Sequence, residues 1–535
     1  MLEKLVVRNF LQFKSLDVAF DREMNIFVGN NDSGKSTVLQ ALEMVLTGRV
    51  SGKPIDGELS PFWFTQSVVA EYLAALQTGT STPTPTILIE AYFRDDEALA
   101  RLKGKNNSCA DDSAGIRLTI SLDSAYAEEY AAYIADPKVV RSVPIEFYRI
   151  DRRDFAGEAT YGTRPLVTAA VIDASTLRLQ SGTDYYLRKS ISANLTPEAR
   201  AKLSLEFRTH RDELLDAPAF VDANKLLSAE RKTLSEKSLT LAADVSARAS
   251  WETSIVPHLD SIPFSQVGQG EQSAFKILLA LEKSGQDRHI VMVEEPENHL
   301  SHSNLNQLIS LLQERSKGQQ LILTTHSSFV LNKLGIDKLR LMSGGDVSSL
   351  DDLKADTKSY FLRLSGFDTL RMVLARAVIL VEGPSDELIV QKAYWQKYDK
   401  SPLEDGVDVL SVQSLAFKRF LELGKELGCK VAVVTDLDDT DTDSKARKRF
   451  EDFEIAGTVK GFVGELEAGK TLEPQLISAA GLAALNAVFE TSYDSEGGLL
   501  EHMTSHKTET ALKIFEHSGI LTMPKYIQDA IAFVK

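Results

Sequence analysis

A glycine-rich stretch near the start of the chain has the residue types of a phosphate-binding loop. It fits G-x-x-x-x-G-K-[ST], follows the apolar strand pattern NIFV and precedes a helical pattern. Glycines in such a loop let backbone N–H groups surround phosphate, while the lysine reaches the terminal phosphates and the serine hydroxyl ligates Mg²⁺. The stretch predicts an ATP and Mg²⁺ site formed by Gly29, Asn30, Asn31, Asp32, Ser33, Gly34, Lys35, Ser36 and Thr37.

Two acids at the end of a later apolar stretch, IVMV, would complete this site. We expect Glu294 to hold Mg²⁺, directly or through water, and Glu295 to orient and polarise the attacking water. About thirty residues further on, the apolar stretch LILTT ends in His326, which could contact the γ-phosphate. The alternative, two acids that merely cap a strand, is disfavoured because this third stretch follows in the order that ATP hydrolysis needs.

A second group of acids occurs in the last third of the chain, where two more apolar stretches end in carboxylates. VILV is followed by Glu382 and Asp386, and KVAVVT is followed by Asp436 and Asp438. Parallel strands bring their carboxyl ends to one edge of a sheet. Aspartates two positions apart on an extended segment also point to the same side. We therefore expect these four side chains to share one edge.

Four carboxylates on one edge repel each other unless cations neutralise them. Hard oxygen ligands favour Mg²⁺ or Mn²⁺. A two-metal carboxylate site suits in-line attack on a phosphodiester, because one ion activates water and the other stabilises the leaving oxygen. Either motif alone is typical of strand-end acids that cap helices. Together, in this order and at this spacing, they favour the metal site.

The bulk composition restricts the class of protein. The chain has 535 residues, too many for one hydrophobic core, and a net charge of −16, which argues against a surface coated with nucleic acid. Its two cysteines, Cys109 and Cys429, exclude a disulfide scaffold and a zinc ribbon. No signal peptide or membrane-spanning run is visible, so we expect a cytoplasmic protein without a membrane partner.

The alternation of strand and helix patterns predicts an α/β fold with four segments. Polar helical patterns replace strands in the second segment, where a helical insertion that pairs two protomers and plain surface helices are equally favoured. A Gly/Ser/Asp-rich connection precedes the last segment. The expected segments are an N-terminal ATPase lobe at 1–164, the helical insertion at 165–250, a C-terminal ATPase lobe at 251–370 and a small parallel-sheet domain at 371–535.

The order of motifs in the first three segments resembles the ABC-type ATPase head of the SMC, Rad50 and RecF proteins. A Gly-x-Gly stretch at 268–270 stands where such heads carry their signature, and Gly270 begins a helical pattern. The signature of one subunit closes the ATP site of another in these heads, so the resemblance implies a composite site and at least a homodimer. One departure is Gln269, which occupies the place of the usual signature serine.

The last segment resembles a Toprim domain, whose pattern is hhhEGxxD followed by DxD. An ABC head followed by a Toprim domain resembles the OLD (overcoming lysogenization defect) family of ATP-dependent nucleases over nearly the whole chain. The resemblance adds Glu473, in TLEPQL, as a further metal ligand. It also adds Lys507, in HKTETAL, as a residue that stabilises charge on the scissile phosphate. The ending MPKYIQDAI is similar to the C-terminal helix of the family, where we expect a packing role.

The resemblance implies a DNA endonuclease or nickase under ATP control, in bacterial defence against phages. Family members include the Gabija nuclease and effectors encoded with a reverse transcriptase in retrons. DNA and a second copy of the chain are therefore expected partners, and a helicase or a reverse transcriptase with its retron DNA would be partners from the same operon. The alternative is an ATP-driven DNA-binding repair clamp like RecF or Rad50, with a Toprim domain that does not cut.

Overall fold

The computed structural model divides into two compact units. The first comprises 1–27, 31–325 and 344–347, and the second comprises 28–30, 326–343 and 348–535. Outside the described residues lie Asn31, 161–165, 174–190, 193–194, 230–239, 245–250, 255, 282–288, 316–317, 336–337, 344, 351–353, 364–366, 413–416, 438–447, 449 and 451–452. Two residues of the sequence-derived sites, Asn31 and Asp438, are among these.

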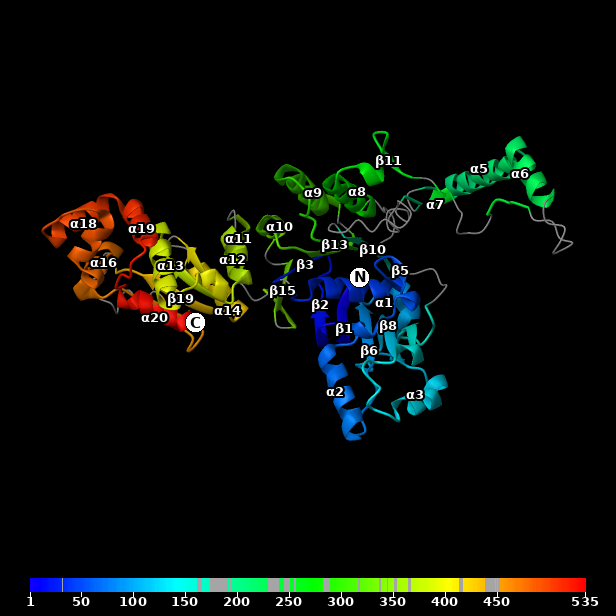
Figure 1. Ribbon diagram of the computed structural model, residues 1–535, viewed down its shortest axis with the longest axis horizontal. Coiled ribbons are helices and arrows are strands. Elements are labelled where there is room, and N and C mark those ends of the chain that lie inside the picture. Colours follow the sequence, from blue (N-terminus) through cyan, green and yellow to red (C-terminus); the bar gives the residue numbers. More distant parts are fainter. Residues whose placement is uncertain are drawn as a thin grey trace. The chain divides into compact units, whose positions relative to one another are not determined.

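An antiparallel sheet forms one layer of the first unit (Figure 1). Its strands follow the order β2-β1-β6-β8-β7, and β9 also pairs with β8. In β2 the exposed and buried positions alternate from Ser15 to Ala19, because successive side chains of a strand point to opposite faces. The strands are β1 (Leu2–Phe10), β2 (Phe13–Ala19), β6 (Ile87–Phe93), β7 (Lys103–Gly104), β8 (Ser113–Leu122) and β9 (Tyr148–Asp154).

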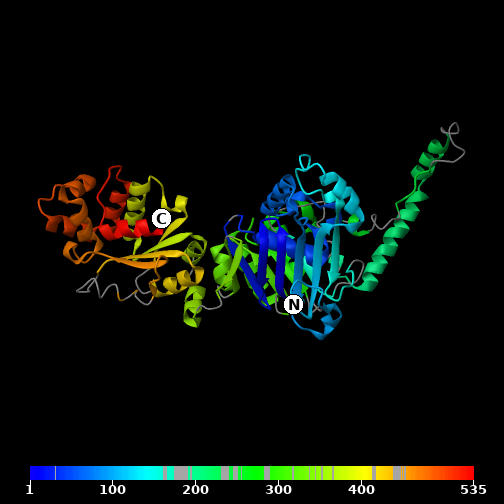
Figure 2. The ribbon, with the colours of Figure 1, turned by 90° about the horizontal axis from the view of Figure 1, so that it is seen from below.

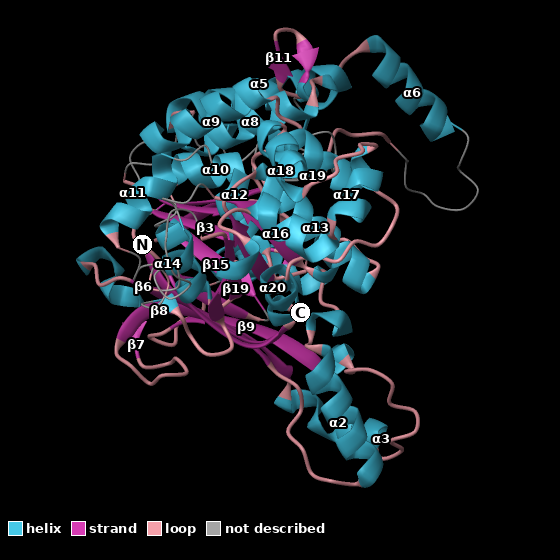
Figure 3. Ribbon diagram, turned by 90° about the vertical axis from the view of Figure 1, so that its left-hand side faces the viewer, coloured by secondary structure: helices cyan, strands magenta, loops and turns pink. Residues whose placement is uncertain are grey.

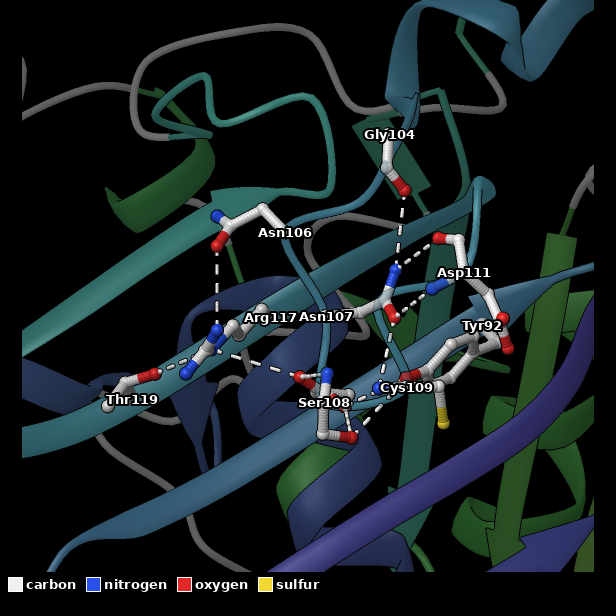
Figure 4. Close-up of polar contacts among 10 residues, drawn as sticks. Tyr92, Gly104, Asn106, Asn107, Ser108, Cys109, Asp111, Arg117 and Thr119 are labelled. Carbon is white, nitrogen blue, oxygen red and sulfur yellow. Dashed lines mark hydrogen bonds and ion pairs between the residues drawn. The ribbon is translucent and has the colours of Figure 1, made fainter.

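A fully buried glutamate anchors the loop that leads into β8. Glu90 of β6 accepts hydrogen bonds from the Ser108 backbone N–H at 2.9 Å and from the Ser108 hydroxyl at 2.5 Å. It also accepts one from the Tyr92 hydroxyl at 2.9 Å, and its carboxylate lies 3.8 Å from Nε of Arg117. Asn107 closes the same loop by donating to the carbonyl of Asp111 at 2.7 Å (Figure 4). Both oxygens of the Glu90 carboxylate therefore face hydrogen-bond donors.

A parallel sheet carries the ATPase motifs of the first unit. β13 pairs with both β10 and β14, and β14 pairs with β3, all in parallel. The positions 290–293 of β13 and all of β14 are buried, as expected for strands covered on both faces. The strands are β3 (Met24–Gly29), β10 (Thr168–Asp173), β13 (His289–Glu294) and β14 (Gln320–Thr324), and the helices near them are α1 (Lys35–Thr47), α8 (Gln269–Leu281) and α9 (His302–Arg315).

The range 165–250 contains β10 as well as helices. Its described helices of more than one turn are α5 (Pro197–Leu215) and α6 (Pro218–Ala229). Thr196 caps α5 by accepting a hydrogen bond from the Ala199 N–H at 3.2 Å, with proline at the first helical position. No residue of α5 is buried, and Figure 2 shows the pair projecting from the sheets of its unit.

The second unit is built on a four-stranded parallel sheet in the order β18-β17-β19-β20. α13 and α20 pack against one face, and α14 covers the other (Figures 2 and 3). The elements are β17 (Ala377–Val381), β18 (Val407–Ser411), β19 (Lys430–Thr435), β20 (Val459–Val463), α13 (Pro384–Tyr398), α14 (Phe417–Leu427) and α20 (Lys525–Val534). The expected α/β fold class is thus confirmed.

Further helices surround these sheets. No single helix of the described residues is long and apolar enough to cross a membrane. Among the described helices, only α16 and α17 taken together, which are joined at a sharp bend, have the length and composition of such a span. These helices are α2 (Gln66–Thr78), α3 (Ala127–Ile134), α7 (Trp251–Ser254), α10 (Ser328–Leu334), α11 (Ala355–Arg363), α12 (Phe367–Leu374), α16 (Leu472–Ala480), α17 (Leu482–Phe489), α18 (Glu496–Ser505) and α19 (Lys507–Glu516). The remaining strands are β4 (Arg49–Val50), β5 (Lys53–Pro54), β11 (His258–Leu259), β12 (Ile262–Pro263), β15 (Leu339–Ser343) and β16 (Asp346–Ser349).

Candidate functional site

The glycine-rich loop joins β3 to α1, as its sequence predicts. Gly34 has φ +102°, and a Cβ placed there would lie 2.2 Å from the Phe13 ring and 2.6 Å from the Gln12 amide. No other residue fits this position without strain. The Ser33 hydroxyl is enclosed and has no hydrogen-bond partner among the described residues. The Thr37 hydroxyl donates to the Gln12 side chain at 2.7 Å.

Lys35 and Ser36 lie at the start of α1, beside the acids that end β13. The Ser36 hydroxyl donates a hydrogen bond to the Glu294 carboxylate. Burial lowers the pKa of Lys35, while Glu295 and Glu294 oppose that shift. Hydroxyl, carboxylate and amine are the groups that an ATP-bound Mg²⁺ and its phosphates need together. The structure thus brings together the loop and the acids that the sequence placed in one site.

The backbone turns sharply after Glu294. Glu295 has φ +45°, a left-handed conformation that is uncommon for a residue with a side chain. Its N–H donates to the Thr324 carbonyl at 3.0 Å, and its carboxylate accepts from Asn298 at 2.7 Å. Thr324 is also the register partner of Glu294 across β13 and β14. The parallel register therefore fixes the position of both acids.

Other predicted residues of the ATP site have different surroundings. Gly29 ends β3, and Asp32 has φ +63° within the loop. Gly270 lies in the first turn of α8, and a Cβ on it would come within 2.2 Å of the His299 carbonyl, so close packing requires glycine. His326 follows the end of β14 by two residues, is half-buried and belongs to the second unit.

In the second unit, β17 and β19 are adjacent and parallel, so their carboxyl ends meet at one edge. Leu380 is paired with Val433, a register that places Glu382 beside Thr435. The Thr435 hydroxyl donates a hydrogen bond to the Glu382 carboxylate. Asp436, the next residue, is half-buried at the same strand end. The pairing of these two strand ends agrees with the sequence-based expectation.

Asp386 follows Glu382 by four residues and lies in the first turn of α13. Its carboxylate accepts a hydrogen bond from the Gly383 N–H at 3.1 Å and so caps the helix. Burial and the charges of Glu382 and Glu473 together raise the pKa of Asp386 to about 7, although backbone hydrogen bonds, including the one from Gly383, oppose the shift. This carboxylate therefore lies among other acids with little compensating positive charge.

Glu473 and Lys507 are brought to this edge from two later helices. Glu473, in the first turn of α16, is 5% exposed and accepts a hydrogen bond from the Thr471 hydroxyl at 2.9 Å. The Lys507 ammonium, at the start of α19, lies 3.2 Å from the Glu473 carboxylate. Glu473 also acts on the pKa of Asp386, so both resemblance-derived residues lie near the acids of the sheet edge.

The donor set of this edge has the chemistry of a Mg²⁺ or Mn²⁺ site. Glu382, Asp386, Asp436 and Glu473 offer carboxylate oxygens, and the raised pKa of Asp386 marks negative charge that a cation would neutralise. Among the residues that the structure describes, no three His, Cys, Asp or Glu side chains are grouped closely enough to hold one ion. Asp438, the remaining predicted ligand, lies outside those residues.

Two residues of this edge are not among the sequence-derived site residues. Thr435 could have been found from the parallel register, because it faces Glu382 across the two strand ends. Tyr526, in the C-terminal helix expected only to pack, is buried in the first turn of α20. Its pKa lies well above the usual value because of burial and of the charges of Asp386 and Asp436. No sequence pattern indicates that proximity.

Family comparisons agree with both groups of motifs. A model of the Toprim domain of proteins like the overcoming lysogenization defect protein matches 373–438. An AAA domain model matches 4–121, and a second AAA model, described with the AbiEii toxin of a Type IV TA system, matches 112–332. The matched ranges contain the phosphate-binding loop, the acids after β13 and the acids after β17 and β19.

Three known proteins show the range of similarity. Endonuclease GajA of Bacillus cereus (strain VD045) is 22% identical over 83% of this chain and 75% of its own length. The replication and repair protein RecF of Lactobacillus acidophilus is 39% identical, but over 11% of this chain and 16% of its own length.

The third is a solved structure, the C-terminal region of the Burkholderia pseudomallei OLD protein. It is 22% identical, covers 30% of this chain and 97% of its own, and has a TM-score of 0.25, so the assignment rests on the family models instead. The family models show an ATPase region of AAA type followed by a Toprim domain. The chain therefore has the ATPase–Toprim composition of the OLD family, as its motifs predicted.

Proposed function

We propose that this chain is an ATP-regulated, divalent-metal-dependent DNA endonuclease or nickase that acts in the cytoplasm in bacterial defence against phages. The observation that carries this proposal is the convergence of Glu382, Asp386, Glu473 and Lys507 from separate elements at one edge of the Toprim sheet. Helix capping does not explain this convergence, because a structural cap would not gather like charges. The similarity to endonuclease GajA supports the same activity.

The acids of the edge would act as ligands of the metal. Glu382, Asp386, Asp436 and Asp438 would hold Mg²⁺ or Mn²⁺, with Glu473 as a further ligand. A metal bound there would activate water and stabilise charge on the phosphodiester. Thr435 fixes one oxygen of Glu382, and Gly383 fixes one of Asp386, so these side chains are positioned before any metal binds.

Lys507 would stabilise the developing charge of the scissile phosphate. Its ammonium lies 3.2 Å from the Glu473 carboxylate, which places it at the edge of the sheet. The side chain is half-exposed, so part of it is accessible to a substrate. A lysine is suited to this role, because its compact charge can approach a phosphate oxygen without fixed geometry. The basic side chain also offsets part of the negative charge that would repel DNA.

The ATPase unit would control cutting. Lys35 and Ser36 would bind the phosphates and Mg²⁺, Glu294 would help to hold the ion, and Glu295 would orient water. His326 would sense the γ-phosphate. Gly270, in the signature stretch, would close the ATP site of a second copy, so hydrolysis would need at least a homodimer.

The helices α5 and α6 support an assembly of two or more copies. Leu205 and Leu214 of α5 are 66% and 51% exposed, and Leu226 of α6 is 72% exposed. Apolar side chains on a projecting helix pair are suited to contact with another protomer. We therefore propose that α5 and α6, within the expected insertion at 165–250, serve dimerisation, whereas β10 of that range belongs to the ATPase sheet. The proposed ATPase lobes are 1–164 and 251–370, and the proposed nuclease domain is 371–535. A helicase or a reverse transcriptase with retron DNA remains the proposed operon partner.

Cleavage of supercoiled plasmid tests the nuclease directly. Wild type and Asp436→Ala would be incubated with plasmid in Mg²⁺ or Mn²⁺, with and without ATP. Wild type is expected to nick or linearise the plasmid, and Asp436→Ala to lose at least about 100-fold in rate, since it removes a metal ligand. Intact plasmid with wild type under all conditions would favour the repair-clamp alternative, and equal cutting by both proteins would contradict the site.

ATP turnover tests the first unit separately. Lys35→Ala should lose hydrolysis, because the loop then has no cation for the terminal phosphates. The melting temperature and the circular dichroism spectrum of the variant would show whether the fold is kept. Wild-type turnover by a folded Lys35→Ala would contradict the assignment of the ATP site.

A further inference from the structure

A column of aromatic rings leads from the core of the Toprim unit to its surface. The ring of Phe489, at the end of α17, lies 6.1 Å from the ring of His502 in α18, centroid to centroid. The His502 ring lies 5.5 Å from that of Tyr493 and 4.9 Å from that of His506. These distances are typical of aromatic rings in contact. Phe489 is buried and His502 is half-buried, whereas His506 is exposed, so the column ends at one ring on the surface.

The exposed ring of His506 is held in a fixed orientation. Its Nδ1 donates a hydrogen bond to the His502 carbonyl at 3.1 Å, since a carbonyl oxygen can only accept. The His506 backbone N–H donates to the same carbonyl at 3.1 Å, and the His506 carbonyl accepts from the Thr510 N–H at 2.9 Å. The residue thus ends α18 and begins α19. A side chain restrained in this way loses little conformational freedom when a ligand binds to it.

The position of His506 in the chain places this ring beside the proposed active site. Lys507 is the next residue, and its ammonium lies 3.2 Å from the Glu473 carboxylate. The helix α18 also packs against α16, which carries Glu473 in its first turn. A DNA strand whose scissile phosphate contacts Lys507 would therefore bring a neighbouring nucleotide to the exposed ring.

Helix capping and core packing do not explain an aromatic side chain at this place. The backbone of His506 makes the bonds that join the two helices, and a backbone can do so in almost any residue. The side chain is exposed, so it adds little to the core. Flat rings that are exposed on one side and supported by other rings are instead typical of surfaces on which nucleobases stack.

We propose that the His506 ring is a stacking surface for an unpaired nucleobase next to the scissile phosphate. This inference rests on the proposed nuclease function and narrows its substrate to DNA that is single-stranded or opened at the point of cutting. In a duplex each base face is covered by the neighbouring base pairs, whereas a single strand can offer a free face. Every base has such a face, so the contact would favour single strands without selecting a sequence.

Binding of two single strands tests the inference: a short thymidine oligonucleotide, and an abasic strand with the same number of phosphates. The full-length chain with Asp436→Ala, chosen to prevent cutting, would be titrated against each labelled strand by fluorescence anisotropy in Mn²⁺. Adding His506→Ala is expected to raise the dissociation constant of the thymidine strand about 10-fold. The dissociation constant of the abasic strand should not change, because that strand has no base to stack.

Two further variants in the same background separate the ring from its surroundings. His506→Phe keeps a flat ring and should restore binding of the thymidine strand. His517→Ala removes a histidine at the other end of α19 and should bind both strands like the background protein. The melting temperature of each variant would show whether its fold is kept.

The results that would overturn the inference differ from those that would overturn the proposed function. Unchanged binding of both strands by His506→Ala, an equal loss on both strands, or no recovery with His506→Phe would each show that the ring does not stack on a base. All three would leave the nuclease intact. Failure of the background protein to bind either strand would also contradict the inference, and intact plasmid with wild type would show that the proposed function fails with it.

Discussion

Glu90 in the ATPase unit and Asp386 in the Toprim unit are both withdrawn from solvent, yet their surroundings are opposite. Glu90 is fully buried and accepts hydrogen bonds from Ser108 and Tyr92, with Arg117 nearby. Asp386 is half-buried and accepts one backbone hydrogen bond, and its neighbours Glu382 and Glu473 carry the same charge.

This difference separates a structural carboxylate, Glu90, from the proposed metal ligand Asp386. A buried acid whose oxygens all meet donors contributes to stability, because ionisation is compensated within the fold. An acid held among other acids costs stability, and such an arrangement is typical of a site that binds a cation or moves a proton. The comparison predicts that removing the first acid should destabilise the fold, and that neutralising the second should stabilise it.

Replacing Glu90 should have the largest effect on stability. Glu90→Ala removes the acceptor of the buried Tyr92 hydroxyl and of both donors of the exposed Ser108, so we expect a loss of about 3 kcal/mol in the free energy of unfolding. Urea denaturation monitored by circular dichroism would measure it. Glu90→Gln keeps one acceptor oxygen and should lose about half as much. A change in Glu90→Ala below about 0.5 kcal/mol would break the comparison.

Neutralising Asp386 should have a smaller effect of opposite sign. Its pKa is about 7 in the folded state against an ordinary 3.8, so the folded chain binds the proton more tightly than the unfolded chain. Stability of the metal-free protein therefore decreases as the pH rises from about 4 to 7. Asp386→Asn, which never ionises, should gain about 1–2 kcal/mol at pH 8, and the gain should shrink towards pH 5.

Thermal unfolding of the metal-free proteins at both pH values would check this expectation. The Asn side chain can still accept the hydrogen bond from Gly383, so the helix cap survives. A variant that is less stable than wild type at pH 8 would show that Asp386 is compensated in the fold and would remove the contrast with Glu90.

Lys507 should have the smallest effect on stability and still matter for cutting. The lysine is 52% exposed, so its ion pair with Glu473 should contribute less than about 1 kcal/mol. Lys507→Ala is nevertheless expected to slow plasmid nicking about 100-fold, since it removes the positive side chain proposed to stabilise negative charge on the scissile phosphate. Lys507→Arg should keep part of the rate. Unchanged nicking by a folded Lys507→Ala would leave this lysine a structural role only.

Much of the fold and of both sites could be predicted from the sequence. The expected strands at 115–122 and 378–381 correspond to β8 and β17, because apolar runs and alternation are set locally by burial. The strand expected at 143–150 is β9, at Tyr148–Asp154, and the structure has a helical turn just before it. The apolar strand β10 occurs in a range assigned to helices, since its pairing with β13 depends on tertiary contact.

Other features of the two sites depend on contacts between distant segments. Glu382 and Asp436 were predictable from strand-end positions, because a parallel register aligns the carboxyl ends of neighbouring strands. Glu473 and Lys507 came only from a family resemblance, since their helices have no local signal for chemistry. Tyr526 could not be found from the sequence, because its proximity to the acids arises from the packing of α20 on the sheet. Glu90 gave no signal either.

The central claim is that the carboxylates at the edge of the Toprim sheet carry out metal-dependent cutting. The most direct measurement is the initial rate of plasmid nicking in Mn²⁺ by folded Asp386→Asn, with Glu90→Gln as the matched control. We predict a rate at least about 100-fold below wild type for Asp386→Asn, despite its higher stability, and a wild-type rate for Glu90→Gln. Nicking by Asp386→Asn at the wild-type rate would contradict the account.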